Sequence, residues 1–266
     1  MTALRVGVFL TGALCVAAVL ALVWTPYDIT RFDIPGRFAS PSAAHLLGTD
    51  QYGRDVLSMV MEGARTALAV AILAVALGMS VGVPLGLLAA ARGGAVDAVI
   101  MRGNDIVFAF PAVLLAILFT AVAGPGSINT VLAVGIFNVP VFAQLTRGAA
   151  RSLWQRDFVL AAQALGQSPW QISRIHILPN VASVLSVQAS IQMSLAIAAE
   201  AALSYIGLGA QPPTASWGRM LSEAQTLFGY SPGLMIWPGL AIVLAVFGFS
   251  LLGDGLRAAF GQRSAL

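Results

Sequence analysis

The chain has 266 residues, of which 58% are hydrophobic and 9% are charged, with a formal net charge of +3. Soluble domains carry roughly 25% charged residues, so this composition excludes a water-soluble globule and predicts a protein with several membrane spans. All 14 basic residues are Arg, and a chain without Lys has neither a Schiff-base lysine nor the P-loop that binds ATP phosphates.

Cysteine, histidine and charge usage exclude further kinds of site. The one cysteine, Cys15, lies in an apolar run, so the chain has no internal disulfide and no thiolate metal site. The histidines, His45 and His176, lie far apart and form no zinc motif, and no HExxH or paired-carboxylate pattern occurs. The Arg residues are scattered singly, which argues against nucleic acid as a partner. We therefore predict no catalytic residue, no metal site and no cofactor bound by this chain.

The first predicted element is an apolar run over residues 6–24, preceded by Arg5. The run is long for a signal-peptide core and lacks a small-x-small cleavage site, so we predict a membrane span. Residues 25–65 are polar and broken by prolines, and they end in an amphipathic stretch over 55–65. This stretch predicts a helix lying at the membrane surface; a loop helix packed on the protein is the alternative.

Five further apolar runs give six predicted spans in all. They lie at residues 66–91, 99–123, 128–145, 184–206 and 234–252. With the N-terminus in the cytoplasm, nine Arg fall on inner segments and five on outer segments, 14 in all. The excess of Arg inside favours this orientation. The predicted fold is an all-α integral membrane protein of six transmembrane helices with cytoplasmic N- and C-termini.

The stretch over residues 157–180 is a long polar interruption between two spans. Its first part predicts a helix with apolar residues at i, i+3, i+4 and i+7 on one face. These residues are Phe158, Ala161, Ala162 and Leu165. Gly166 then permits a sharp turn and a close backbone approach, and a second helical piece runs from 170 to 178 until Pro179. We interpret the stretch as an element that a soluble partner binds; an ordinary hairpin is the alternative.

The pattern of this stretch resembles the cytoplasmic coupling loop of ABC importer permeases. Ala161-Ala162-x3-Gly166 and, further on, Leu178-Pro179 match that family, in which Glu stands at the position of Leu160 and Ile at that of His176. Two other stretches look like the C-type subunit of its dipeptide, oligopeptide and nickel branch. They are HLLGTDQYGRDV over 45–56 and LSYIGLGAQPPT over 203–214, followed by SWG at 216–218.

The resemblance implies a type I ABC importer permease in the bacterial inner membrane. It implies import of di- or oligopeptides, with ATPase motion passed on through residues 157–180. The implied partners are a homologous second permease in a heterodimer, two ATP-binding subunits or domains that carry ATP and Mg, an extracytoplasmic substrate-binding protein, and membrane lipid. The implied coupling residues are Asp157, Phe158, Ala161, Ala162, Leu165, Gly166, His176, Leu178 and Pro179.

We expect the chain to divide into three parts. Residues 1–65 hold the first span, the extracytoplasmic loop and the amphipathic stretch. Residues 66–257 form the permease core, with a coupling loop over 146–183, and 258–266 form a cytoplasmic tail.

Polar residues within the predicted spans are candidates for a translocation path. Ser186, Ser190 and Ser194 form a narrow stripe on the fifth span, and they either line the path or pack one helix on another. Glu200 is the one carboxylate well inside a span, so it should be paired, protonated or in a water-filled cavity. A structural role at the neighbouring helix ends is the alternative. The segment 207–230 either receives a delivery protein, closes the outer mouth, or is a packed loop.

Three alternative functions remain. A nickel or other small-ligand importer would belong to the same family. An ion-coupled secondary transporter would need intramembrane acids and inverted repeats, of which the sequence shows one acid and no convincing repeat. A membrane scaffold without transport activity gives no reason for the Ala-Ala-x3-Gly pattern.

Overall fold

The computed structural model describes residues 2–263, and most of this part is helical. The helices are α1 (Thr2–Val23), α2 (Val56–Arg92), α3 (Gly94–Phe108), α4 (Ala112–Ala123), α5 (Ser127–Leu153), α6 (Asp157–Ala164), α7 (Pro169–Ile172), α8 (Leu178–Tyr205), α9 (Trp217–Ala224) and α10 (Gly233–Arg263). Short turns of other helix types lie at Ile34–Gly36, Ser173–Ile177 and Gln225–Leu227.

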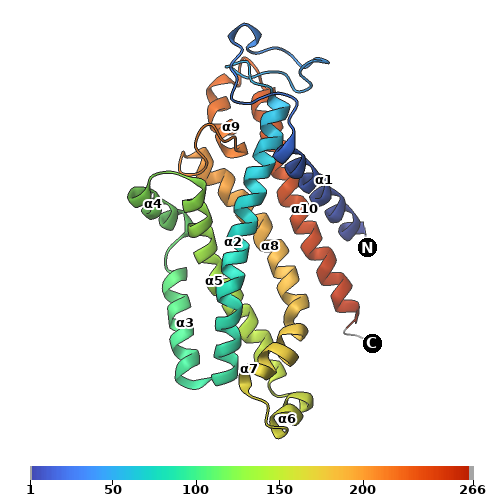
Figure 1. Ribbon diagram of the computed structural model, residues 1–266, viewed down its shortest axis with the longest axis vertical. Helices are drawn as coiled ribbons and strands as arrows, with labels where there is room; N and C mark the ends of the chain where they lie inside the picture. Colours follow the sequence, from blue (N-terminus) through green and yellow to red (C-terminus); the bar gives the residue numbers. More distant parts are fainter. Residues whose placement is uncertain (1, 264–266) are drawn as a thin grey trace.

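Five segments of the described part are long and apolar enough to cross a membrane, and the bent pair of α3 and α4 makes a sixth if it counts as one span. The predicted all-α membrane fold is therefore confirmed, with five membrane segments, or six if the bent pair is one span. The long helices lie along one axis (Figure 1), with α6 and α7 at one end, called the α6 end. Residues 24–55 and α9 lie at the other end, called the α9 end.

Helix α2 is longer than the sequence predicted. Its N-cap is Asp55, whose Oδ2 accepts hydrogen bonds of 2.8 Å from the backbone N–H and from the hydroxyl of Ser58. The stretch 55–65 is thus the start of a 37-residue helix, and the prediction of a separate helix at the membrane surface is wrong. The reason is tertiary: Gly63 faces the indole of Trp217, which holds this stretch against the protein. The expected boundary between residues 65 and 66 falls inside α2.

The third predicted span, over 99–123, is broken rather than continuous. Helix α3 ends at Phe108, α4 begins at Ala112, and the two axes differ by 77°. Pro111 causes the break because it offers no N–H and disfavours helical geometry at the residue before it. Its own ψ of 140° is extended.

Helices α2 and α5 pack closely through three glycines of α2, Gly78, Gly82 and Gly86. A Cβ on Gly86 would lie 2.5 Å from the carbonyl oxygen of Ala143, and one on Gly82 would lie 2.9 Å from the Cβ of Phe142. Small residues four apart are the usual means by which membrane helices approach each other. This G-x3-G-x3-G pattern is visible in the sequence, and the sequence analysis missed it.

Helix α8 continues directly from the coupling stretch. The predicted stop at Pro179 is wrong, because Pro179 lies in the first turn of α8, where a missing N–H costs nothing. The wide π turn at Ser173–Ile177 joins α7 to α8, so that Pro169–Tyr205 is one helical segment of 37 residues, long enough to cross a membrane. The predicted coupling loop over 146–183 is correspondingly shorter, since α5 extends to Leu153.

The outer layer of the bundle is formed by α1 and α10, which lie side by side (Figure 1). Close contact again depends on glycine: a Cβ on Gly255 of α10 would lie 2.6 Å from the Cβ of Leu4. Helix α10 includes the predicted tail up to Arg263, and residues 264–266 of that tail lie outside the described residues.

Candidate functional site

Helix α6 has one buried and one exposed side. Val159 and Ala162 are buried, with Val159 fully inaccessible. Phe158, Ala161 and Leu165 are exposed, Leu165 to 81%. The predicted common face of four residues is therefore wrong for Ala162, which points into the protein. In so short a helix, a residue at the edge of the apolar face can be either buried or exposed, and the packing of the helix determines which.

Gly166 ends α6 with a left-handed backbone, at φ 79°. The N–H of Gly166 donates to the carbonyl of Gln163 at 2.9 Å, and the N–H of Gln167 donates to that of Ala162 at 3.2 Å. This pair of bonds is a Schellman motif, in which glycine is favoured because it has no Cβ penalty at positive φ. No atom lies within 4 Å of a Cβ built here, so within this chain glycine is needed for the turn and not for a close approach.

A capping box follows the turn. The Ser168 hydroxyl accepts from the Gln171 N–H at 3.3 Å, and the Gln171 side chain accepts from the Ser168 N–H at 2.9 Å. These reciprocal bonds satisfy two otherwise unpaired groups at the start of α7.

His176 connects the turn to the start of α8. Its Nε2 lies 2.9 Å from Oε1 of Gln167, and its carbonyl accepts from Nδ2 of Asn180 at 2.6 Å. Leu178 is half-buried, while Pro179 and Asp157 are exposed. An acidic residue in the first turn, as Asp157 is in α6, suits the positive end of the helix dipole. The structure thus brings the predicted coupling residues together in one compact element.

This element is fixed to the long helices by an apolar cluster at the α6 end. Val159 and Ala162 of α6, together with Ile172 and Ile177, are buried in the cluster. The partners of these side chains come from α2, α5 and α8. They include Val83, Leu87, Phe142, Ala150, Val181 and Leu185. Because buried side chains pack at crystal-like density, the cluster holds the element against these helices.

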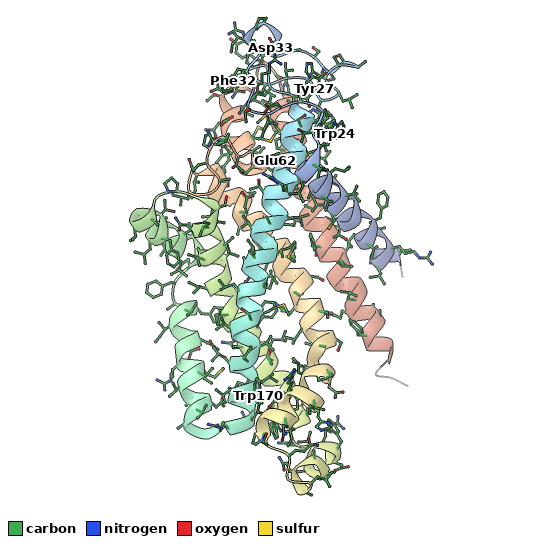
Figure 2. All side chains as sticks on the ribbon, viewed as in Figure 1. Trp24, Tyr27, Phe32, Asp33, Glu62 and Trp170 are labelled. Atoms are coloured by element: carbon green, nitrogen blue, oxygen red, sulfur yellow. The ribbon has the colours of Figure 1, made fainter. Side chains whose placement is uncertain are left out.

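The opposite side of the element carries large exposed apolar side chains. We call this set the α6 surface; it consists of Phe158, Leu160, Leu165, Trp170 and Ile175. Figure 2 shows Trp170 at the α6 end of the molecule. Exposed apolar side chains grouped in this way mark a contact site for another molecule.

The serine stripe of α8 faces α10. Ser194 donates to the carbonyl of Val246 at 2.9 Å, and Ser190 lies beside Gly253. Both are buried, whereas Ser186 is exposed and donates to the carbonyl of Ala182. The packing interpretation accounts for Ser190 and Ser194, and neither residue lines the large groove described below.

Glu200 is 1% exposed and belongs to a hydrogen-bonded group at the end of α8. Its Oε1 accepts from the Ser204 hydroxyl at 2.7 Å, and the Ser204 oxygen accepts from the N–H of Ala210 at 3.1 Å. Glu200 therefore ties α8 to the segment that follows it, as the structural alternative predicts.

The segment after α8 is packed down on α2. The Trp217 indole N–H donates to the carbonyl of Val60 at 2.9 Å, and the Thr66 hydroxyl donates to that of Ala215 at 2.9 Å. A Cβ on Gly218 would collide with the carbonyl oxygen of Ala201. The packed-loop interpretation therefore holds for residues 215–218.

Ion pairs join this segment to residues 45–56. Arg54 bonds Asp50 at 2.6 Å and Glu223 at 3.1 Å, and Arg219 bonds Glu223 at 2.7 Å. The motif over 45–56 thus serves to join the loop before α2 to α9, and the two form one cap at the α9 end.

A groove of about 850 Å³ lies along α2 and α5. Its walls are mostly apolar and include Leu73, Leu77, Val131 and Leu132. The sequence analysis missed it, because it depends on how the two helices cross.

Comparisons with known proteins agree on one family. The family described as "Binding-protein-dependent transport system inner membrane component" matches residues 82–265. The glutathione transport system permease protein GsiD of Pectobacterium atrosepticum is 43% identical, over 98% of this chain and 88% of the relative. The dipeptide transport system permease protein DppC of Alkalihalophilus pseudofirmus is 39% identical, over 97% and 85%.

A solved structure has the same fold. It is the MetNI methionine ABC transporter in an inward-facing conformation, with a TM-score of 0.62 and 20% identity. The match covers 75% of this chain and 95% of the MetNI chain.

Proposed function

Because the chain belongs to the family of binding-protein-dependent transport system inner membrane components, we propose that it carries peptides across the inner membrane. It is the permease subunit of an ABC importer and not itself an enzyme, since ATP is hydrolysed by a separate subunit. A permease of this kind works with another permease, with ATPase subunits and with a substrate-binding protein. This membership excludes an ion-coupled secondary transporter and a scaffold.

The proposal places the α6 end in the cytoplasm. Arg151, Arg156 and Arg174 belong to the α6 end, where an excess of Arg favours the cytoplasmic side. Both termini then also lie on the cytoplasmic side. In the proposed complex the second permease is a homologue that forms a heterodimer with this chain. Two ATP-binding subunits or domains, which hold ATP and Mg, contact the α6 surface.

The α6 surface is where ATPase motion enters the permease under this proposal. The observation that carries it is the two-sided character of α6. Leu165 is 81% exposed, while Val159, six residues earlier and on the other side, is fully buried in the cluster that also holds side chains of α2, α5 and α8. A partner that moves the exposed side therefore moves the long helices as a rigid body, a known form of conformational transition.

The substrate class is proposed from the relatives, which are named for the transport of glutathione and of dipeptides. Both substrates are small peptides. Nickel import remains the alternative within the family, and no feature of the described residues favours it.

Uptake measurements test the proposal. Labelled dipeptide and labelled nickel are given to parent cells and to cells that lack only this chain, with and without depletion of cellular ATP. The proposal predicts that dipeptide uptake alone depends on the chain and that it stops when ATP is depleted. Loss of nickel uptake instead of dipeptide uptake would show that the substrate class is wrong.

A further inference from the structure

Two cavities share Arg65 as a lining residue, in the third turn of α2. The first is the apolar groove of about 850 Å³ along α2 and α5. The second has a volume of about 490 Å³ and lies at the α9 end, between the end of α1, the start of α2 and the loop after α8. Arg65 and Thr214 line both cavities, so they lie between the second cavity and the groove.

Charge is unevenly distributed between the two cavities. Among the described residues that line the groove, Arg65 is the one that carries a charge. The second cavity has Asp28 and Glu62 in its wall besides Arg65. Figure 2 shows Glu62 on α2 toward the α9 end, with Trp24 at the end of α1. A molecule that passes from the second cavity into the groove therefore meets two acids and one base together.

The bond to Glu62 does not use all the N–H donors of the Arg65 guanidinium. Its Nη2 is bonded to Glu62 Oε1, and 40% of its side chain is exposed. A guanidinium has five N–H donors in a planar fork that matches a carboxylate. The bond to Glu62 orients the group and leaves further donors for a ligand.

Asp28 offers the opposite charge. Its Oδ1 accepts from the Thr30 hydroxyl at 2.7 Å and from the Thr30 N–H at 2.8 Å. These bonds hold the pKa of Asp28 below its ordinary value, which keeps the carboxylate ionised. The wall of the second cavity thus presents a carboxylate that can receive an ammonium group.

We propose that Arg65 and Asp28 form an entry site for the two charged ends of a peptide. Arg65 binds the terminal carboxylate at the mouth of the groove, and Asp28 binds the terminal ammonium group. The apolar groove beyond receives the peptide as it leaves the site. This inference rests on the proposed import of peptides, and it adds that the permease selects free peptide ends.

The dimensions fit such a ligand. Small-ligand sites have volumes of about 300–1,000 Å³, and the second cavity falls in this range. Two extended residues span about 7 Å at most, so a dipeptide is short enough for a cavity of that size. Charge complementarity distinguishes this occupant from lipid tails, which would not need Asp28 or Glu62.

The test uses the complete importer in vesicles, with its binding protein. Uptake is measured for one dipeptide, for its C-terminal amide and for its N-acetyl form. Each variant is expressed as a ratio to the unaltered importer for the same substrate, so the preference of the binding protein cancels. Arg65→Gln should lower uptake of the free dipeptide about tenfold, the effect of one lost charge-assisted hydrogen bond, and should leave that of the amide unchanged. Asp28→Asn should lower uptake of the free dipeptide and leave that of the N-acetyl form unchanged.

Two further variants serve as controls. Arg65→Lys keeps the charge but loses the planar fork, so its uptake of the free dipeptide should lie between that of Arg65→Gln and that of the unaltered importer. Arg37→Gln removes an exposed charge from the loop that carries Asp28, and Arg37 lines neither cavity. The uptake of each substrate, relative to that by the unaltered importer, should stay the same.

The outcomes separate the inference from the proposed function. If Arg65→Gln lowers the uptake of all three substrates equally and the two permeases no longer copurify, the groove is a contact between the two permeases. The proposed entry site is then wrong. Equal uptake by the Arg65→Gln variant and the unaltered importer would also refute the entry site. If the unaltered importer takes up no peptide at all, the proposed function fails instead.

Discussion

The side chains of Gln167 and His176 are joined by a hydrogen bond of 2.9 Å that closes the loop between α6 and α8. His176 stands where the family pattern has Ile, so in this chain a polar bond links the turn at Gly166 to the start of α8. The bond holds the turn after α6 in a fixed position relative to the start of α8.

Gln167→Leu should therefore loosen the loop without unfolding the protein. Loss of one hydrogen bond costs about 1 kcal/mol, so local opening should become about fivefold more frequent. Hydrogen exchange of the backbone amides over residues 166–178 measures this directly. Ser152→Ala is the control, since its hydroxyl bonds only the carbonyl of Ala149 outside the loop. Unchanged exchange in Gln167→Leu would mean that the bond does not hold the loop.

Gly166→Ala and Gly148→Ala should have opposite effects on stability. Neither added methyl group meets an atom within 4 Å, so the comparison isolates the backbone. At Gly166, with φ 79°, alanine costs about 1–2 kcal/mol. At Gly148, inside α5, alanine should stabilise the helix by about 1 kcal/mol. In thermal unfolding of the purified importer, the midpoint should fall for Gly166→Ala and rise for Gly148→Ala, and equal midpoints would contradict the assigned turn.

Gly82→Ala should weaken the contact between α2 and α5. The added methyl group would collide with the carbonyl oxygen of Val139 and lie 2.9 Å from the Cβ of Phe142. Overpacking of this kind costs about 1–3 kcal/mol. Gly12→Ala is the matched control, because Gly12 also lies in a membrane helix but has open space around it. The amount of intact permease recovered from membranes should fall for the first variant only; an equal yield would argue against the close crossing.

Glu200→Gln should import peptide nearly as well as the unaltered chain. The amide oxygen can still accept the bond from Ser204, so uptake should stay within about twofold at mildly acidic and mildly alkaline external pH. A loss of uptake that follows the external pH would show that Glu200 has more than a structural role.

Much of the fold follows from local sequence. The apolar runs predicted six membrane segments, and the Ala-Ala-x3-Gly pattern located α6 and its turn. Gly166 was predicted to permit a sharp turn, and it does so with φ 79°, because a helix end of this kind is determined by a few neighbouring residues.

The sequence-based predictions were wrong where the packing depends on residues that are distant in the sequence. Trp217 holds the start of α2 through a bond to Val60, a contact that spans 157 residues and that no local pattern reveals. The inward turn of Ala162 depends on the cluster built by α2, α5 and α8. The groove beside Arg65 likewise depends on the crossing of α2 and α5. In each case, periodicity predicted the helix but not which neighbour it would meet.

The most direct test of the coupling role compares Leu165→Arg with Leu46→Arg in the reconstituted importer. Both leucines are exposed, Leu165 on the α6 surface and Leu46 at the α9 end, so neither change should disturb folding. We predict that Leu165→Arg lowers ATP-driven peptide uptake about tenfold or more and releases the ATPase subunits, as loss of a central interface residue does. Leu46→Arg should retain the ATPase subunits. If Leu165→Arg keeps them and imports peptide at the normal rate, the α6 surface is not where ATPase motion enters the permease.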